Sequence, residues 1–432
     1  MNDKLNHETK FADSAALHGA MLEIGVSSKK AVRKLSTVST KSKNKALFEA
    51  AKAIRDKKAI IKAANNEDMS TAKKKRISGA MLDRLLLDDS RIEGMAKSLE
   101  DIAALPDPVG DIMAEWERPN GLQINRVRVP LGVIGIIYES RPNVTADAGG
   151  LCLKSGNATI LRGGSESFHS SSTILDCLQQ GLKKADLPIT AIQQVPTRDR
   201  AGVGELLSMS EYIDIIVPRG GKSLIERVQK ESRVPVIAHL DGNCHIYLEK
   251  TADPTMAKNV VFNAKMRRPG ICGATESLIV DRSVASQLLP AIIDSLATAG
   301  CEIRGDDNTQ DIDSRVQPAT DEDWGTEYLD TIISVKQVDG LEEAINHINK
   351  HGSHHTDSIV TSDGKAAAKF LETVDSAIVL HNASTQFADG GEFGMGAEIG
   401  ISTGRLHARG PVGVEQLTTF KYIVRGDGQV RP

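Results

Sequence analysis

The sequence lacks the features that mark several classes of protein. Its five cysteines are an odd number without regular spacing, so they do not form a disulfide framework. Its apolar runs, such as Leu131–Tyr138, fall far short of the ~20 residues that a membrane helix needs. The stretch Met1–Lys10 is polar and lacks the apolar core of a signal peptide. We therefore expect a cytoplasmic protein.

An excess of positive charge is also missing. The net charge is -4, whereas binding to a phosphate backbone needs a basic face, so nucleic acid is not expected as the main partner. The strongest basic run, Lys73–Arg76, lies in a Lys-rich helical region and is interpreted as a solvated helix face. At roughly 100–200 residues per domain, the 432 residues predict two or three domains.

The first hundred residues have a helical pattern that ends at two prolines. Apolar positions in Lys45–Lys57 and Gly94–Ala104 recur at helical spacing, and Pro106 and Pro108 stop the helices. Next, Glu115–Pro119 and Leu122–Val129 flank Asn-Gly, which predicts a β-hairpin. Its polar second strand suggests that the hairpin projects from the body and pairs with another subunit. Lys421–Val430 predicts a second hairpin, at the C-terminus.

From Leu131 onward, β-type runs alternate with helical runs, which predicts parallel sheets with helices on both faces. The expected strands are Val133–Ile137, Ala158–Leu161, Ile192–Val195, Ile213–Val217, Glu276–Val280, Ile332–Val335, Ser358–Thr361 and Ala377–Leu380. In such folds ligands bind at the carboxyl ends of the strands. Gly390–Gly400 contains five glycines and is expected to form a loop against a ligand or an interface.

Cys272 is the strongest candidate for a catalytic residue. It stands between Gly270 and Gly273, which would let the backbone turn sharply and let a ligand approach main-chain N–H groups. Lys265, Arg267 and Arg268 lie just upstream, and their charge is expected to lower the pKa of a nearby thiol and to attract an anionic substrate. The alternative is an ordinary buried cysteine in a turn.

Two basic glycine loops join a strand to a helix, and both are candidates for binding phosphate groups. They are Arg162–Glu166, with Gly163 and Gly164, and Arg219–Ser223, with Gly220 and Gly221. The open N–H groups at a helix N-terminus attract anions. Neither loop matches Gly-x-Gly-x-x-Gly or a P-loop, so each alone is also compatible with ordinary turn chemistry.

Two further sets of residues are open to more than one interpretation. Arg141 follows a strand end and is either a clamp for a substrate carboxylate or phosphate, or part of a loop salt bridge. The spacing of His347, His351, His354 and His355 matches none of the common zinc patterns, and no cysteine is near them in the sequence. No metal is expected.

Several long motifs resemble the γ-glutamyl phosphate reductase family. They are Val129–Gly164, Asp241–His245, Asn263–Ala274, Asn382–Asp389 and Phe393–Gly413. The resemblance covers nearly the whole chain after about Ala15. It implies membership of the aldehyde dehydrogenase superfamily, an α/β fold with two open, mostly parallel αβα domains, and a β-hairpin oligomerisation element.

The resemblance also implies domains. Residues 15–114 and 130–240 would form a cofactor-binding domain, with N-terminal helices and a doubly wound sheet. Residues 241–410 would form the catalytic domain that carries Cys272, and residues 115–129 and 411–432 the oligomerisation hairpins.

The implied reaction is the NADPH-dependent reduction of L-glutamate 5-phosphate to L-glutamate 5-semialdehyde, through a thioester on Cys272, in proline biosynthesis. The implied partners are a second copy of the chain and glutamate 5-kinase. Arg141 or Arg405 would hold the substrate α-carboxylate, and Lys265, Arg267 and Arg268 the leaving phosphate. The alternative is a hydrolysing, NAD(P)-dependent aldehyde dehydrogenase.

Individual positions follow from the wider superfamily pattern. Arg162 falls where the superfamily has a lysine that contacts the adenosine ribose, and it could pair with a 2′-phosphate. Gly220, Gly221 and Ser223 match the loop near the pyrophosphate, and Glu327 matches the residue that holds the nicotinamide ribose. His239 stands in place of the general-base Glu that a hydrolysing enzyme uses, which disfavours hydrolysis. We expect His239 to bind the substrate phosphate, although a histidine could also serve as a base.

Overall fold

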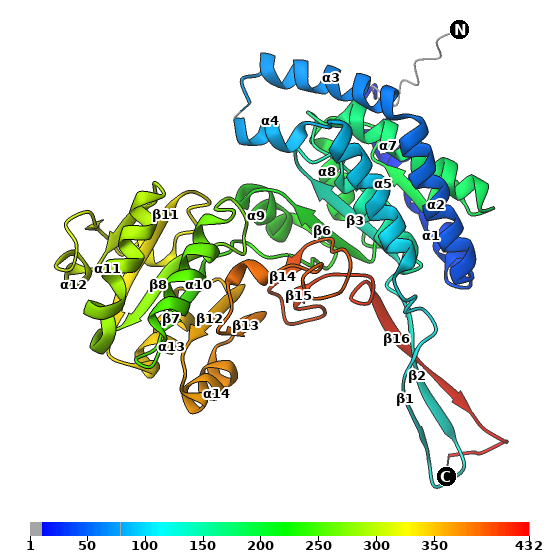
Figure 1. Cartoon of the computed structure of the whole chain (residues 1–432). Helices are drawn as coiled ribbons and strands as arrows, with labels where there is room; N and C mark the ends of the chain where they lie inside the picture. Colours follow the sequence, from blue (N-terminus) through cyan, green and yellow to red (C-terminus); the bar gives the residue numbers. More distant parts are fainter. Residues whose placement is uncertain (1–10, 78, 432) are drawn as a thin grey trace. The chain divides into compact units, whose positions relative to one another are not determined.

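The computed structural model describes residues 11–77 and 79–431 (Figure 1). The chain forms two compact units. The first comprises the chain up to Ala238, Gly394–Gly400 and the chain from Val412; the second comprises His239–Phe393 and Ile401–Pro411. Gly394–Gly400 thus lies outside the unit that carries Cys272, whereas the sequence placed it inside. Reciprocal hydrogen bonds explain this, because Ile399 N–H donates to Val412 O and Val412 N–H donates to Gly400 O.

The first unit begins with helices, as predicted. They are α1 (Ser14–Leu35), α2 (Thr40–Asp56), α3 (Lys58–Lys74), α4 (Gly79–Leu85) and α5 (Asp89–Ala104). Asp13, Ser39 and Asp88 cap three of them by accepting hydrogen bonds from first-turn N–H groups. Helix α5 ends at Leu105, which is extended, because the residue before a proline is disfavoured in the α region.

A four-stranded parallel sheet forms the core of the first unit, in the order β5-β4-β3-β6. The strands are β3 (Val133–Tyr138), β4 (Ala158–Arg162), β5 (Ile192–Gln194) and β6 (Ile215–Arg219). The intervening helices are α6 (Val144–Lys154), α7 (Phe168–Lys184), η1 (Ile189–Ala191), α8 (Ala201–Ser208) and α9 (Lys222–Glu231). The strand order reverses direction at β3, and such a switch point is where open α/β sheets bind ligands.

A three-stranded antiparallel sheet also belongs to the first unit. The predicted hairpin is present as β1 (Ile112–Glu117) and β2 (Gln123–Pro130). The prediction of a C-terminal hairpin is wrong. Thr418–Arg425 forms one strand, β16, which pairs with β2 and does not fold back on itself. Beyond β16, the Gln429 side chain contacts the β1–β2 turn and donates to Asn120 O at 2.9 Å.

The second unit contains a seven-stranded parallel sheet in the order β10-β9-β11-β8-β7-β12-β13. The strands are β7 (Cys244–Leu248), β8 (Thr275–Asp281), β9 (Glu302–Gly305), β10 (Gln317–Pro318), β11 (Ile332–Val338), β12 (Thr356–Val360) and β13 (Ile378–His381). Strands β7, β9 and β10 were not predicted. Two short strands, β14 (Ile401–Ser402) and β15 (Gly410–Pro411), form a separate antiparallel pair.

Helices cover both faces of this sheet (Figure 1). One apolar core joins it to α10 (Pro254–Met266) and α11 (Arg282–Thr298), through residues such as Val261 and Leu289. The other joins it to α13 (Leu341–His351) and α14 (Gly364–Thr373), through Ile348 and Phe370. Short helical turns complete the unit at α12 (Asp307–Gln310), η2 (Asp323–Gly325) and η3 (Thr385–Phe387). Across the described residues, we find no helix with the length and apolarity required to span a bilayer.

Candidate active site

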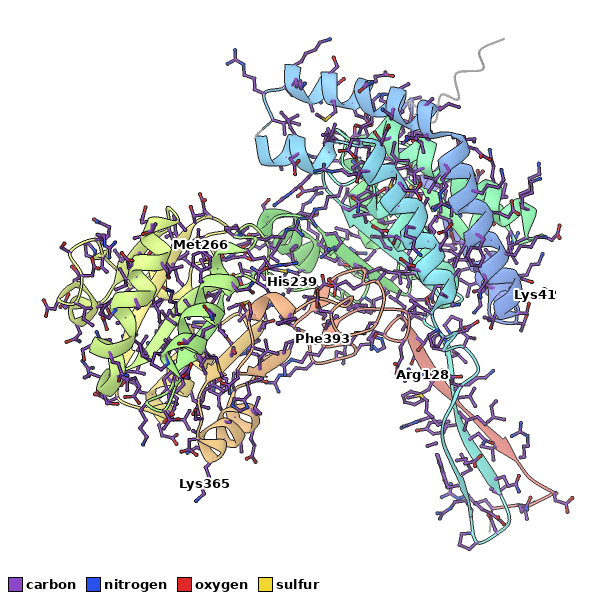
Figure 2. The ribbon with its side chains drawn as sticks, in the orientation of Figure 1. Lys41, Arg128, His239, Met266, Lys365 and Phe393 are labelled. Carbon is purple, nitrogen blue, oxygen red and sulfur yellow. The ribbon has the colours of Figure 1, made fainter. Side chains whose placement is uncertain are left out.

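Helix α10 ends at Met266, which is labelled in Figure 2. Cys272 lies in the loop that leads from there into β8. Neither of its flanking glycines has a positive φ. A Cβ on Gly273 would lie 3.2 Å from Thr385 O, so only that glycine is needed for close packing, while Gly270 has no neighbour nearer than 3.7 Å. A glycine is needed more strictly at Gly242, because a Cβ there would lie 2.8 Å from the Cα and Cβ of Cys272. Gly242 was not singled out from the sequence, because its contact with Cys272 depends on the fold.

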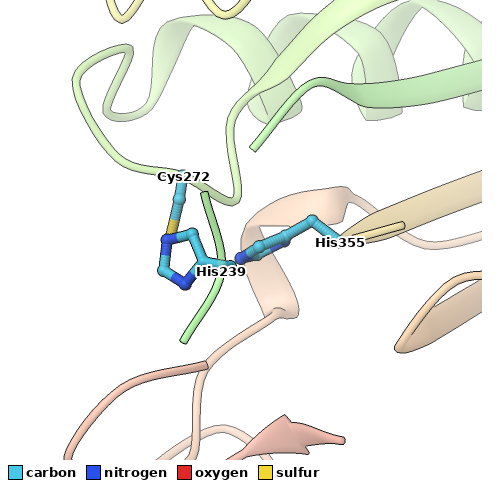
Figure 3. Close-up of side chains that lie close together, drawn as sticks. All are labelled: His239, Cys272 and His355. Carbon is cyan, nitrogen blue, oxygen red and sulfur yellow. The ribbon is translucent and has the colours of Figure 1, made fainter. Parts of the chain in front are cut away.

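Two histidines face the Cys272 thiol (Figure 3). His239 Nδ1 is 2.7 Å from Ile401 O. Since a carbonyl oxygen only accepts, Nδ1 carries the proton, and Nε2 of the neutral ring keeps its lone pair. His355 is fully buried, and its Nδ1 lies 2.9 Å from Thr356 Oγ1, which leaves Nε2 for the thiol. The two rings meet edge to face, with centroids 5.0 Å apart.

The three residues come together because of the strand order in the second sheet. His239 precedes β7, Cys272 precedes β8 and His355 precedes β12, and these three strands are neighbours in the order β8-β7-β12. The cluster therefore lies at the amino ends of the strands, not at the carboxyl ends where the sequence led us to expect ligands. The contact between His355 and the Cys272 thiol was not predicted from the sequence. Cys244 and Cys272, the cysteines that lie near His355 in the fold, are far from it along the chain.

The histidines, and not the upstream basic residues, perturb the thiol. Burial raises the pKa of Cys272, but the charge of His355, together with the charge and hydrogen bond of His239, outweighs it and holds that pKa well below its ordinary value. The expectation that Lys265 would act on the thiol is therefore wrong. Its ammonium group forms an ion pair with Glu276, and both side chains are completely buried. A leaving phosphate would have to compete with Glu276 for Lys265, and its binding there stays a prediction.

Arg267 and Arg268 remain exposed at the end of α10. Arg267 Nη1 lies 3.4 Å from Gln386 Oε1, and the Gln386 amide in turn donates to Ala264 O at 2.9 Å. These contacts fix the backbone between α10 and the Cys272 loop. Binding of phosphate by either arginine stays a prediction.

The two arginines expected to hold the substrate α-carboxylate have different surroundings. Arg405 forms an ion pair with Asp375, a carboxylate that Arg409 also binds at 2.8 Å. A substrate would have to compete with Asp375, so the prediction of Arg405 as an open clamp is not supported by its contacts. Arg141 is half-buried in the first unit, directly after Ser140, whose φ is +43°. The role of Arg141 stays a prediction.

Glu327 lies close to the thiol, as its predicted role near the nicotinamide requires. Burial raises the pKa of Glu327, the backbone N–H of Gly242 lowers it, and the neighbouring Cys272 and Asp241 raise it again. Its contact with the ribose is untested and stays a prediction.

Arg162 serves the protein's own backbone. The side chain is buried and donates hydrogen bonds to Gly163 O, to Arg198 O at 3.0 Å and to Asp199 O at 3.3 Å. Burial lowers the pKa of Arg162. The guanidinium group therefore holds two loops together, and the expectation that it pairs with a 2′-phosphate is not supported by this geometry.

Acidic side chains of the first unit occupy both glycine loops. Glu166 accepts hydrogen bonds from Ser140 N–H at 2.7 Å and from its hydroxyl at 2.8 Å, close beside Gly164. At the N-terminus of α9, the Gly221 N–H donates to Glu139 at 2.9 Å. Because this N–H already holds a carboxylate, the helix start is able to bind an anion. Binding of a cofactor pyrophosphate there stays a prediction.

The fold and the reactive cysteine define a class of protein. The chain belongs to the aldehyde dehydrogenase family, whose family model matches residues 19–324. Within it the chain belongs with the γ-glutamyl phosphate reductases. It is 62% identical over 419 residues to the protein of that name from Paramagnetospirillum magneticum, covering 97% of this chain and 99% of the relative. It is 60% identical to that from Methylocella silvestris, covering 100% of both.

Solved structures agree with this assignment. The crystal structure of γ-glutamyl phosphate reductase from Thermotoga maritima is 44% identical in sequence, with a TM-score of 0.94, and the match covers 95% of this chain and 100% of that one. An acetylating aldehyde dehydrogenase from Geobacillus thermoglucosidasius has a TM-score of 0.68 at 16% identity, over 98% and 100% of the two chains. The second likeness concerns the fold alone.

Proposed function

We propose that this protein reduces L-glutamate 5-phosphate to L-glutamate 5-semialdehyde and phosphate with NADPH, in proline biosynthesis. The observation that carries the proposal is the Cys272 thiol between two histidines, in a chain 60–62% identical to proteins named γ-glutamyl phosphate reductase. A hydrolysing aldehyde dehydrogenase is the weaker alternative, because the relatives reported above are named γ-glutamyl phosphate reductase and, by the superfamily pattern, His239 replaces the general-base Glu of a hydrolysing enzyme.

The first half of the reaction uses the cluster directly. His239 Nε2 takes the proton of the Cys272 thiol, since Nδ1–H is fixed on Ile401 O. The thiolate attacks the acyl carbon, a C–S bond forms, and the C–O bond to phosphate breaks with its electron pair leaving on phosphate. A thioester on Cys272 remains. The N–H of Cys272 is the first candidate to stabilise the oxyanion of each tetrahedral intermediate.

The second half needs a reductant, and NADPH supplies a hydride to the thioester carbon when it is bound. The start of α9, with Gly220, Gly221 and Ser223, would receive the pyrophosphate after Glu139 is displaced from the Gly221 N–H. Glu327 would hold the nicotinamide ribose. The thiohemiacetal oxyanion on Cys272 then collapses, the C–S bond breaks, and the thiolate leaves with the electron pair.

The reverse reaction tests the proposal, because it avoids the unstable acyl phosphate. Reduction of NADP+ should require both glutamate 5-semialdehyde and phosphate, and it should vanish in Cys272→Ser while NADPH binding persists. Cys301→Ser is the matched control, since Cys301 lies in the same unit but outside the cluster. Substantial turnover by purified Cys272→Ser would refute the covalent mechanism.

We also propose that the three-stranded sheet β1-β2-β16 associates with a second copy of the chain. Trp116, Tyr422 and Val424 are 40%, 56% and 54% exposed. They lie on one face, because Trp116 and Val424 both stand opposite Ile124, and Tyr422 contacts Trp116 edge on. Exposed aromatic groups of this kind favour burial in an interface.

Two finer points belong to the same proposal. Glutamate 5-kinase is the proposed partner, since its acyl phosphate product is labile. The cytoplasm is the proposed compartment, where reducing conditions keep thiols such as the five free cysteines of this chain unpaired.

A further inference from the structure

We propose that His239, Cys272 and His355 also form a binding site for one soft divalent transition-metal ion, of which Zn²⁺ is the best match, and that the bound ion blocks the nucleophile. Metal binding would be a second property of the cluster, beside its role in the reaction. It does not depend on which acyl substrate the protein reduces.

The geometry of the three ligand atoms supports the proposal. One ring nitrogen from each histidine and Sγ of Cys272 all lie within 4.8 Å of one another (Figure 3). Bond lengths of ~2.1 Å to nitrogen and ~2.3 Å to sulfur place the ligand atoms of a tetrahedral zinc site about 3.5 Å apart. Small side-chain rotations are enough to close this cluster on an ion. A donor set of one thiolate and two imidazoles suits zinc and disfavours Mg²⁺ and Ca²⁺, which prefer oxygen.

The surroundings of the two imidazoles are those of metal ligands. A histidine that binds a metal through one nitrogen usually engages the other with a carbonyl or another polar group. His239 does so through Ile401 O at 2.7 Å, and His355 lies 2.9 Å from Thr356 Oγ1. The other nitrogen of His355, Nε2, is buried and has no hydrogen-bond partner. A buried polar atom without a partner needs an explanation, and a bound ion supplies one.

The coordination would remain open at one position. In the part of the chain that the structure describes, the group consists of these three side chains. Water or phosphate would therefore complete the tetrahedron, as in sites that keep an exchangeable ligand. The sulfur lone pair that attacks the substrate would be used in the metal–sulfur bond. Zinc should therefore inhibit reversibly, and it should compete with reagents that modify the thiol.

Cobalt is the best probe, because Co²⁺ bound to a thiolate in a tetrahedral site has a sulfur-to-metal absorption band that Zn²⁺ lacks. Metal-free full-length protein should take up one Co²⁺ with this band, and one equivalent of Zn²⁺ should abolish it. Cys272→Ser should lose the band, while Cys301→Ser should keep it. His239→Gln and His355→Gln should each weaken binding by more than the roughly 10–100-fold that loss of an outer-shell partner costs.

A second measurement avoids the variants and any effect they have on folding. Zn²⁺ should slow alkylation of Cys272 by iodoacetamide in the wild-type protein, as followed by peptide mass spectrometry, and a chelator should restore the rate. Mg²⁺ should have no effect. Absence of a thiolate band, its persistence in Cys272→Ser, or unprotected alkylation at saturating Zn²⁺ would each overturn the proposal. Failure of the proposed reaction would be recognised separately, as absent turnover in metal-free buffer.

Discussion

Lys265→Met tests whether Lys265 is a structural residue or a substrate ligand. The side chain is completely buried and forms an ion pair with Glu276, which is also completely buried. Its ammonium group lies 6.0 Å from the Tyr328 ring centroid. Methionine has a similar length and no charge, so the substitution leaves the Glu276 carboxylate unpaired in the interior.

The expected cost follows from that unpaired charge. Removing one partner of a buried ion pair costs about 3–5 kcal/mol. At about 2–4 °C per kcal/mol for a unit of this size, Tm should fall by roughly 6–20 °C. Lys265→Met/Glu276→Leu should recover part of the loss, because replacing both partners by apolar groups is often neutral. It should remain about 1–3 kcal/mol short, because the Leu329 N–H, 3.1 Å from Glu276, loses its acceptor.

Thermal unfolding of the single and double variants, followed by circular dichroism, measures these differences. Lys258→Met is the matched control, since Lys258 lies on the same helix but is exposed, and its Tm should stay close to that of the wild type. KM for phosphate in the reverse reaction, measured well below Tm, should be little changed in the double variant. An unchanged Tm in Lys265→Met together with a raised KM for phosphate would refute the structural role.

Four further predictions follow. Arg162→Ala should raise the Michaelis constants for NADPH and NADH by similar factors, because Arg162 holds backbone carbonyls; a loss confined to NADPH would show that it reads the 2′-phosphate. Tyr422→Glu should shift the protein to a smaller assembly by light scattering, while Lys421→Glu, on the other face of the strand, should not. His347→Phe should reduce acid sensitivity: burial lowers the pKa of His347 to about 2, so only the unfolded chain binds this proton below about pH 6.5, and folding stability falls by ~1.4 kcal/mol per pH unit. Urea denaturation at pH 7.5 and 5 should show a smaller difference in the variant, and an equal difference would contradict this account. Without phosphate, aldehyde oxidation should stop after at most one turnover per site; sustained production of free glutamate would instead identify a hydrolysing enzyme.

Local patterns in the sequence were enough to predict most of the helices and strands. Asn120-Gly121 between two β-type runs gives the β1–β2 hairpin, and Pro106 marks the end of α5, because turn chemistry and proline act within a few residues. The prediction of a hairpin at Lys421–Val430 was wrong because strand pairing depends on residues far away in the sequence. The alternating pattern of this segment indicates a strand, but only the distant β2 decides that this strand pairs there and does not fold back on itself.

The candidate site was predictable only in part. Cys272 was predicted from the glycines and basic residues next to it in the sequence, and His239 from the superfamily pattern. His355 was not, because its contact with Cys272 depends on β12 and β8 both lying beside β7. Lys265 was misassigned because distance along the chain was read as distance in space. Lys265 is instead buried in an ion pair with Glu276, one residue into β8.

The pairing of β16 with β2 has a consequence for synthesis on the ribosome. Arg128 and Thr418, which are in hydrogen-bond contact across this pair, are separated by 290 positions. The Asn157 amide and the Leu131 N–H both donate to Leu417 O, so the residue just before β16 is also bonded to the loops that lead into β3 and β4. While the nascent chain grows, one edge of β2 stays unpaired until β16 has been synthesised and has left the exit tunnel. A chain that stopped before Thr418 would therefore leave this edge of β2 without its partner strand, and an exposed edge is prone to pairing with other chains.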